Sequence, residues 1–324
     1  MEEALYGQGG YYDCDDPAIG PGGDFITGAS ASPFFGRMTA RLLTALGEEL
    51  PGPADYLEAG YGGGQHLRAM VGALEDEEGL VERRILAWDR IERAVPAGVV
   101  AVRDLEAVAA RSISGLVFSY ELFDALAVHR LVRRGDELRE LLVGERDGCF
   151  EWLEGGLADP DLHVWNLPDL VEGQVIDVTP QWAAVYRDLA QRLDSGLVVT
   201  CDYGFSRHRL FDVRVRRHGT LACYRRHRVH RDPFVDFGRQ DMTAHVDFTT
   251  LIEAGEAEGL ETVGLFRQAE WLAGIGLLEG MPDRSPEERI EIMQLMDLEG
   301  MGEEIRVLVQ ARGVDPAKVL PHLA

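Results

Sequence analysis

The chain has 324 residues, 46% of them hydrophobic, and a formal net charge of −24 at pH 7. No apolar run approaches the roughly 20 residues that a membrane-spanning helix needs, and an acidic surface of this size repels the phosphates of DNA and RNA. Residues 1–16 also lack the basic start and apolar middle of a signal peptide, so we expect a cytoplasmic protein that binds neither membranes nor nucleic acids.

The first predicted helix begins at Pro33. Phe35, Met38, Leu42 and Leu46 recur there at the spacing of one helix face, and Gly47 lies near the helix end. Short apolar runs then alternate with helical patterns as far as residue 205, which predicts βαβ units around a parallel sheet. A second helix is expected at Pro180–Leu193. The predicted strands are Ala54–Ala59, Ile85–Asp89, Val99–Arg103, Gly115–Glu121 and Gly196–Asp202.

The alternation breaks between Val128 and Trp165. Two or three short strands are predicted there, joined by the turns Arg-Gly-Asp (134–136) and Arg-Asp-Gly (146–148). This antiparallel element is either a peripheral insertion or a wall of a substrate cleft. Near the C-terminus, Ser285 and Glu288 have the spacing of a capping box and predict a helix that begins at Pro286.

A glycine-rich turn follows the first predicted strand, in Glu58–Gln65, EAGYGGGQ. No Gly-Lys-Ser/Thr follows, which excludes a Walker A loop, and a dinucleotide-binding GxGxxG fails because position 65 is Gln. Glycine alternation after an acidic residue is instead typical of the methyltransferase loop that surrounds S-adenosylmethionine (SAM). The alternative is a strand–turn–helix junction that needs glycine only for positive φ angles and close packing.

Asp89 ends the second predicted strand, 25 residues after Gly64. A carboxylate at this place can accept hydrogen bonds from both ribose hydroxyls. Dinucleotide enzymes place an acid similarly, so Asp89 supports an adenosine ligand without distinguishing SAM from a dinucleotide.

Further segments match one family in order over nearly the whole chain: Gly23–Met38, Glu58–Leu67, Tyr120–Arg130, Cys201–Phe205, Gly219–His227, Gly238–Phe248, Gln268 with Trp271–Gly276, and MGEEIRVL near the end. The sequence resembles the MidA-like family of SAM-dependent methyltransferases, whose mitochondrial member is an assembly factor of respiratory complex I that methylates a protein arginine. Tyr120 and Ala127 stand where the family usually has Asn and Pro, Tyr61 and Gly63 where it has Pro and Arg, and Asp89 where it has Glu.

The resemblance implies an α/β class I methyltransferase fold, a Rossmann-like, seven-stranded doubly wound sheet with an inserted antiparallel element and extra C-terminal helices. Residues 1–50 would form an N-terminal segment and helix that cover the cofactor site. The SAM-binding core would comprise residues 51–128 and 176–270, with 129–175 as an inserted substrate-side element and 271–324 as a C-terminal helical tail.

Glu121 and Asp124 follow the fourth predicted strand, where a doubly wound sheet presents groups to its ligand crevice. A guanidinium acceptor has a pKa above roughly 12, so a carboxylate must orient it and help to remove a proton. We assign Glu121 to this role and Asp124 as second candidate; the alternative for Asp124 is the N-cap of a following helix. His245 is a candidate proton acceptor, with a structural role beside Asp247 as the alternative.

Other site residues are expected around these. Asp202 and Tyr203 follow the fifth strand and are predicted at the substrate rim. No metal is expected, because the four cysteines form no CxxC pair and Cys223, His227 and His230 lack a fourth ligand at zinc-like spacing. The residues expected to bind SAM are Asp24, Thr27, Glu58, Gly60, Gly62, Gly64, Asp89, Asp104 and Glu121.

The basic run from Arg214 to Arg231 holds seven arginines. It is interpreted as a solvated loop that pairs with the acidic surface, with the steering of an acidic partner as the alternative.

We therefore predict a SAM-dependent methyltransferase that acts on a protein, at an arginine side chain in a basic segment, with a homodimer left open. The first alternative is a methyltransferase-like binding or assembly protein with little turnover, motivated by Tyr120 and Ala127. The others are a small-molecule methyltransferase and a nicotinamide-dependent oxidoreductase, which predicts the glycine that is missing at Gln65.

Overall fold

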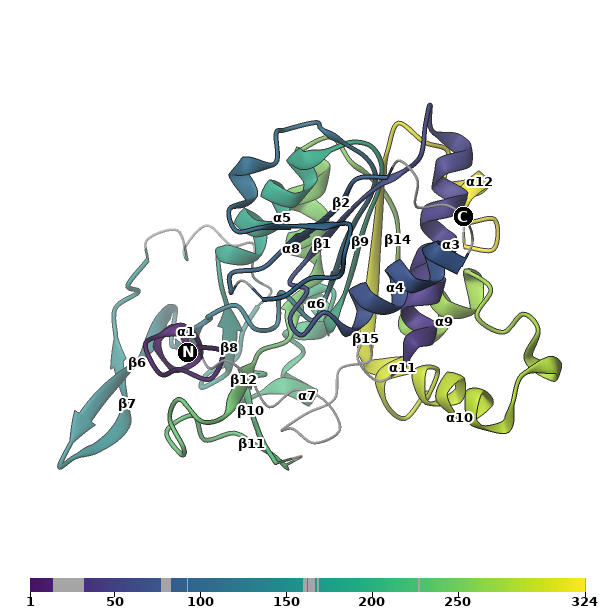
Figure 1. Ribbon diagram of the computed structural model, residues 1–324. Helices are drawn as coiled ribbons and strands as arrows, with labels where there is room; N and C mark the ends of the chain where they lie inside the picture. The colour runs from purple at the N-terminus through teal and green to yellow at the C-terminus, as the bar shows by residue number, and fades with distance from the viewer. Residues whose placement is uncertain are drawn as a thin grey trace.

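A twisted, mostly parallel sheet forms the centre of the molecule (Figure 1). The computed structural model describes residues 1–13, 32–76, 83–91, 93–159, 162, 167, 169–226 and 228–323. The strand order of the central sheet is β14-β15-β9-β4-β1-β2-β3, and the short β13 also pairs with β9. β15 is antiparallel to β9 and β14. The strands are β1 (Asp55–Ala59), β2 (Ile85–Trp88), β3 (Val99–Val102), β4 (Ile113–Tyr120), β9 (Leu193–Phe205), β13 (Val246–Asp247), β14 (Glu261–Arg267) and β15 (Ile305–Arg312).

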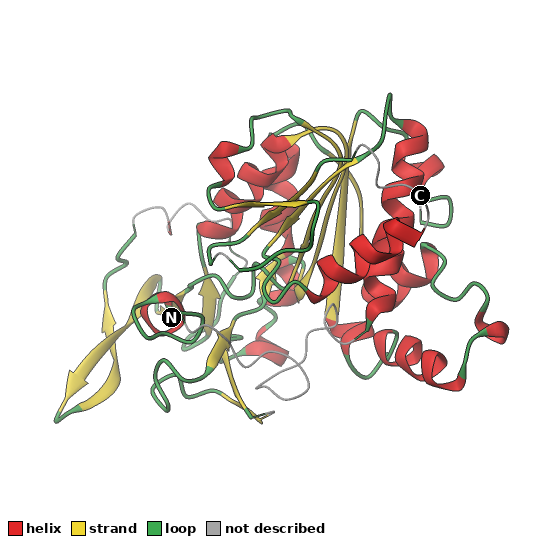
Figure 2. Cartoon of the chain, viewed as in Figure 1, coloured by secondary structure: helices red, strands yellow, loops and turns green. Residues whose placement is uncertain are grey.

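Helices cover both faces of this sheet, as Figure 2 shows. Successive strand residues point to opposite faces: Phe118 of β4 packs in one core cluster with Phe35 of α3, and Val117 in another with Trp182 of α5. The longer helices are α3 (Pro33–Glu49), α4 (Gln65–Asp76), α5 (Gln181–Arg192), α8 (Phe248–Ala257), α9 (Gln268–Gly274) and α10 (Pro286–Leu295). The shorter ones are α1 (Glu2–Tyr6), η1 (Leu105–Ala107), α6 (Arg207–Leu210), α7 (Val213–Arg216), η3 (Met281–Asp283), α11 (Met301–Glu304) and α12 (Pro316–Val319).

The five predicted strands and the helices predicted at Pro33 and Pro180 are confirmed, as is the capping box at Ser285. The range 271–324, expected to be a C-terminal helical tail, holds α10, α11 and α12 but also β15, which lies in the central sheet between β9 and β14. β15 is buried on both faces, so its apolar residues form a run that periodicity does not distinguish from a buried helix.

The inserted element is a second sheet with the order β7-β6-β5-β8. It consists of β5 (His129–Arg134), β6 (Glu137–Arg146), β7 (Cys149–Gly155) and β8 (Val175–Val178), and its β6–β7 hairpin projects from the body of the molecule (Figure 1). Gly135 and Gly148 have positive φ in the two predicted turns, and β5 with β6 and β6 with β7 pair antiparallel across these turns, which confirms the antiparallel prediction.

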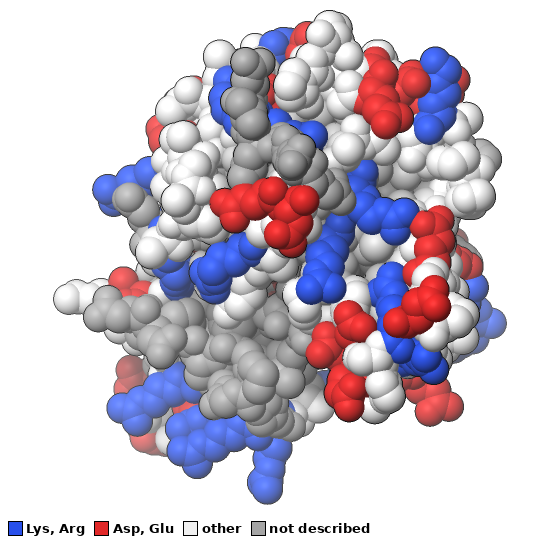
Figure 3. Space-filling view, turned by 45° about the vertical axis from the view of Figure 1, so that its right-hand side comes forward, with Lys and Arg blue, Asp and Glu red and all other residues white. Residues whose placement is uncertain are grey.

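A third sheet, β11-β10-β12, comprises β10 (Ala222–Arg225), β11 (Arg228–His230) and β12 (Asp241–Thr243). The basic run therefore holds α7, β10 and β11 and is not a plain loop. On the face drawn in Figure 3, basic side chains form several groups among the acidic ones, so the charge of −24 is not spread evenly. No helix in the described part of the chain is long and apolar enough to cross a membrane.

Candidate active site

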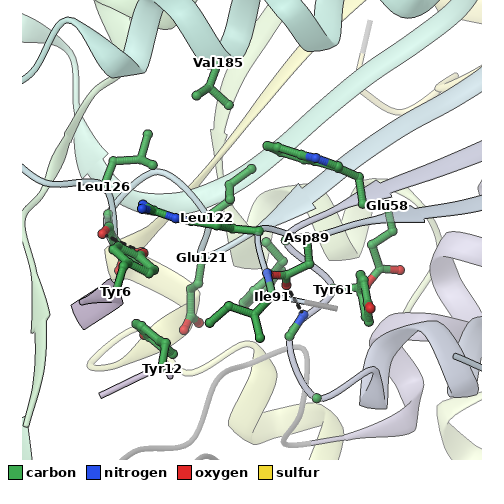
Figure 4. A pocket seen from close by; sticks show the side chains of 18 of the residues that line it. Tyr6, Tyr12, Glu58, Tyr61, Asp89, Ile91, Glu121, Leu122, Leu126 and Val185 are labelled. Atoms are coloured by element: carbon green, nitrogen blue, oxygen red, sulfur yellow. Dashed lines mark hydrogen bonds between the residues drawn. The ribbon is translucent and has the colours of Figure 1, made fainter. Parts of the chain in front are cut away.

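A cavity of about 750 Å³ lies at the carboxyl ends of β1, β2 and β4. The strand order reverses between β1 and β4, and open α/β sheets bind their ligands at such a point. In Figure 4, Glu58 and Tyr61 lie on one side of the pocket and Tyr6 and Tyr12 on the opposite side, with Asp89 between them. The predicted residues Glu58, Gly60, Gly62, Asp89, Asp104, Glu121, Asp124 and Tyr203 all line this one cavity.

The glycine loop follows β1 and has left-handed backbone at three places. Gly60, Gly62 and Gly64 have φ of 73°, 50° and 71°, a region that glycine enters without steric cost. At Gly60 a Cβ would also lie 2.9 Å from Cδ1 and 3.2 Å from Cβ of Leu122, so a side chain there would displace Leu122. The loop therefore presents bare backbone to the pocket.

Glu58 is buried below the loop. Its Oε2 accepts a hydrogen bond from the Tyr56 hydroxyl at 2.8 Å and lies 3.0 Å from Nδ1 of His66. Among the described residues, none binds the other carboxylate oxygen, and Glu58 lines the pocket. That oxygen is available to accept hydrogen bonds from a ligand amino group.

Asp89 joins the glycine loop to the end of β2. Its Oδ2 accepts from the Gly62 N–H and its Oδ1 from the Ile91 N–H, both at 2.9 Å, and because Asp89 lines the pocket its carboxylate can accept further hydrogen bonds from ligand hydroxyls. Burial raises the pKa of Asp89, and these backbone hydrogen bonds oppose the rise. Asp104, beyond β3, caps η1 through Oδ1 and lines the same cavity.

These features fit SAM. The bare loop would allow close approach of a methionine chain, Glu58 could accept hydrogen bonds from its ammonium group, Asp89 could accept them from a ribose diol, and Asp104 is a further acceptor in the cavity. Figure 4 shows the Gly62–Asp89 hydrogen bond that holds these parts together.

The opposite end of the cavity is lined by carboxylates and tyrosines from distant parts of the chain. We call it the acid–tyrosine end; its residues are Tyr12, Glu121, Asp124, Tyr203, Tyr224, Asp241 and Glu304. Glu121 has a φ of 51°, unusual for a residue other than glycine and typical of positions where structure is strained for function. Burial, and then the charges of Asp202, Glu121 and Asp241, raise the pKa of Asp124 well above its usual range.

Two of the three tyrosines at this end, Tyr203 and Tyr224, lie near these carboxylates. Burial raises the pKa of Tyr203, with further contributions from Glu121, Asp124 and Glu304, and the same causes, burial first and then Asp124, raise the pKa of Tyr224. The acidic groups are thus close enough to repel one another, and the end is electrostatically suited to a cation.

Asp202 does not line the pocket, although it was predicted at the rim. It is fully buried, and its Oδ2 accepts from the N–H groups of Leu122 and Phe123 at 3.1 and 2.8 Å. Since β9 lies beside β4, a carboxylate at the end of β9 reaches the turn that carries Glu121 and Asp124. Asp202 therefore positions that turn.

The stability of the fold should fall as pH rises through neutrality, because burial raises the pKa of Asp202 to about 7. A raised carboxyl pKa gives a stabilising contribution that is complete below the unfolded pKa of roughly 4 and lost as pH rises through the folded pKa. In Asp202→Asn, the fall in Tm between pH 6 and pH 8 should be smaller than in the wild type by an amount of the order of 5 °C, measured by differential scanning calorimetry.

Asp212→Asn is the control, because an arginine lowers the pKa of Asp212 to about 2 and it does not titrate in this range. The Asp202 variant will be less stable overall, since an amide has one acceptor oxygen and cannot accept both from the Tyr203 N–H and from the N–H groups of Leu122 and Phe123. The slope with pH is the readout, and equal slopes in wild type and Asp202→Asn would contradict the assignment.

Several predicted residues lie elsewhere. His245 does not line the cavity; burial, and then the charges of Arg216 and Arg231, lower its pKa to about 4. Asp124 does line the cavity, but its alternative role as the N-cap of a following helix is wrong, because turns and then β5 follow it. Asp24 and Thr27 lie outside the described residues. No described residue of 129–175 lines this cavity, so the described part of the inserted element is not a wall of it.

Residues that the prediction missed close the pocket. The Tyr12 hydroxyl donates to Asp241 at 2.8 Å, and the Tyr6 hydroxyl donates to the Ala125 carbonyl at 3.0 Å. Tyr224, Asp241 and Glu304 stand in segments that had been matched to the family, but only the fold brings them together. Tyr120 donates from its hydroxyl to Gln268 at 2.7 Å, so the residue that replaces the family's Asn ties β4 to α9.

No group of three or more His, Cys, Asp or Glu suited to a metal ion occurs in the described ranges.

Comparison with known proteins identifies the family. Residues 36–266 match the family described as "Putative S-adenosyl-L-methionine-dependent methyltransferase". The chain is 26% identical to the mitochondrial protein arginine methyltransferase NDUFAF7 homolog of Drosophila melanogaster, over 97% of this chain and 80% of that protein. It is 29% identical to the Xenopus tropicalis protein arginine methyltransferase NDUFAF7, over 49% of this chain, and that match spans only 36% of the Xenopus protein.

Solved structures agree in fold and in cofactor. A Burkholderia thailandensis protein bound to S-adenosylhomocysteine is 27% identical with a TM-score of 0.85, over 97% of this chain and 87% of that one. A second crystal structure from that organism is 28% identical with a TM-score of 0.83, over 100% and 88% of the two chains. The doubly wound sheet is therefore the predicted class I methyltransferase sheet, its cofactor is SAM and not a nicotinamide, and the chain belongs to the MidA-like family of SAM-dependent methyltransferases.

Proposed function

We propose that this chain methylates arginine side chains of a protein substrate. The observation that carries the proposal is the acid–tyrosine end of the cavity, which lies beyond the expected SAM site and combines several carboxylates with tyrosine rings. The relatives from Drosophila and Xenopus, which are named protein arginine methyltransferases, support the same acceptor.

The electrostatics favour a cationic acceptor. Asp124 is buried among Asp202, Glu121 and Asp241, whose charges raise its pKa, so a cation placed among these groups relieves their mutual repulsion. A planar guanidinium binds carboxylates through paired N–H groups and stacks on aromatic rings, and this end supplies both kinds of partner.

The chemistry needs a group that takes a proton from the acceptor. SAM supplies an electrophilic methyl group on a sulfonium. Glu121, which follows the carboxyl end of β4, would hold the guanidinium so that one nitrogen points at that methyl group. It would also accept the proton that this nitrogen loses. Asp124 and Glu304 would hold the remaining N–H groups, and the Tyr203 and Tyr224 rings would exclude water.

Mass spectrometry of peptides tests this proposal. A library in which each peptide holds one arginine would be incubated with the full chain and SAM carrying a CD3 methyl group, beside matched libraries with lysine or citrulline at that position. We expect CD3 on arginine only. Transfer to lysine, or to no peptide despite SAM binding, would overturn it, and the latter result would favour the binding or assembly protein. Transfer only to small guanidines would indicate a small-molecule methyltransferase.

A further inference from the structure

A second cavity, of about 250 Å³, lies at the corner where β9 ends and β15 begins. Tyr203 and Glu304 line the first cavity, while Phe205 and Glu303 line the second. Because each residue of a strand advances by about 3.3 Å, Tyr203 and Phe205 on β9 are about 7 Å apart. The second cavity is therefore a neighbour of the acid–tyrosine end on the same edge of the sheet.

Three guanidinium groups surround the ring of Phe205. The Cζ atoms of Arg216, Arg306 and Arg209 lie 4.0, 5.0 and 5.3 Å from its centroid. Arginine–aromatic stacking fixes a guanidinium plane while its N–H groups stay available. We call Phe205, Arg209, Arg216 and Arg306 the arginine cage.

The cage carries excess positive charge. Of the carboxylates that line the second cavity, Glu270 and Glu303 both bind Arg267, and Glu303 also lies 3.5 Å from Arg306. Arg209 and Arg216 form no salt bridge with any residue of the described ranges; Nη1 of Arg216 donates to the Arg209 carbonyl at 3.0 Å. Burial, and then the charge of Arg209, lower the pKa of Arg216, as expected of crowded cations.

We propose that the arginine cage binds an anionic side chain of the acceptor protein, close in sequence to the arginine that is methylated. The inference rests on the proposed function and refines it, because an acceptor arginine at the acid–tyrosine end places neighbouring peptide residues over the cage. An extended peptide covers about 3.3–3.6 Å per residue, so the anion falls about two to four residues from the arginine. Carboxylates and phosphates both match guanidinium groups.

Matched peptides test whether the enzyme prefers acceptors that carry an anionic side chain near the arginine. From an arginine peptide that the wild type methylates, variants would carry Glu, Gln, phosphoserine or Ser at each position two to four residues on either side. At one position we expect kcat/KM to be about 10- to 100-fold higher for the anion than for its neutral partner, since charge-assisted pairs contribute about 1.5–3 kcal/mol. The Glu and phosphoserine arms show which anion is preferred; equal rates at every position would overturn the proposal.

Substitutions in the cage separate binding from folding. In Arg216→Gln and in Arg209→Gln, the preference for the anionic peptide should fall towards one, while kcat/KM for the neutral peptide stays within about twofold. Arg214→Gln is the matched control: Arg214 lies on the same short helix, has a side chain 81% exposed and pairs with Asp212. An undiminished preference in Arg216→Gln would contradict the cage as the anion site.

A binding measurement distinguishes failure of this inference from failure of the proposed function. Fluorescence anisotropy would follow a labelled Glu-containing peptide whose arginine is replaced by norleucine, so that no methyl transfer is needed. We expect binding that weakens with added salt and in Arg216→Gln but not in Arg214→Gln. Anion-dependent binding without methylation of any arginine peptide would support the cage as an anion site and overturn arginine as the acceptor. Arginine methylation without anion-dependent binding would support arginine as the acceptor and overturn the cage as an anion site.

Discussion

Replacing Glu121 by glutamine is expected to lower methyl transfer about 10²- to 10³-fold. SAM affinity should stay within about threefold, because Glu121, although also expected to bind SAM, lies at the acid–tyrosine end and not in the glycine loop. Glutamine has nearly the shape of glutamate and keeps one acceptor oxygen, so the turn after β4 should persist. It lacks the negative charge that holds a guanidinium and the basicity that accepts its proton. Removing the charge should also lower the pKa of Asp124, because the charge of Glu121 raises this pKa in addition to burial and Asp202.

Single-turnover transfer from CD3-labelled SAM, followed by mass spectrometry, measures the first quantity, and titration calorimetry with S-adenosylhomocysteine measures the second. Glu137→Gln, at the exposed start of β6, is the control and should behave as the wild type. A Glu121 variant that keeps more than about a third of the wild-type rate would show that this carboxylate is not the group that takes the proton.

Replacing Gly62 by arginine is expected to weaken SAM binding more than about 100-fold. Gly62 has a φ of 50°, which costs a side-chain-bearing residue of the order of 1 kcal/mol, and its N–H donates to the Asp89 carboxylate at 2.9 Å. Gly62 lines the main cavity, and a Cβ there meets no atom within 4 Å, so the arginine side chain can extend into the cavity and occupy space expected for the ligand.

Equilibrium dialysis with labelled S-adenosylhomocysteine measures the loss. Gly52→Arg makes the same exchange at an exposed glycine where a Cβ also meets nothing within 4 Å and φ is not in the left-handed region, and it should bind as the wild type does. Circular dichroism verifies that both variants fold. Affinity within threefold of wild type in Gly62→Arg would mean that the loop does not border the ligand.

The central sheet could be read from the sequence because its parallel strands are buried on both faces. Leu116, Val117 and Phe118 are all buried and form a continuous apolar run bounded by turn residues, which is the pattern of such a strand. The glycine loop was readable for a related reason: its function is local, since one short segment supplies the positive φ angles and Glu58 together.

The acid–tyrosine end was only partly readable, because its residues come from many elements. Tyr12, Tyr224 and Glu304 are separated by most of the chain and meet only through the order of strands β4, β9 and β15 and the pairing of β10 with β12. No local sequence pattern indicates that residues so far apart in the chain lie together in the fold. Asp202 shows the converse, since its place at a strand end suggested the pocket rim, but backbone N–H groups of the neighbouring turn hold its carboxylate inside the protein.

His245 illustrates the limit of assigning roles by residue type. An imidazole is the usual proton acceptor near neutral pH, yet burial beside a group of arginines lowers the pKa of His245 to about 4, and its place is outside the main cavity. The pKa of a side chain thus does not by itself identify a catalytic group; the role proposed for Glu121 rests on its place in the main cavity.

The measurement that tests the cofactor site most directly is calorimetric titration of the wild-type chain with SAM, S-adenosylhomocysteine and NAD. The glycine loop, Glu58 and Asp89 predict micromolar binding of the two adenosyl amino acids at one site per chain and no binding of NAD, because the loop lacks the third glycine of a dinucleotide fingerprint. Binding of NAD with no heat from either adenosyl ligand would contradict the account at its foundation.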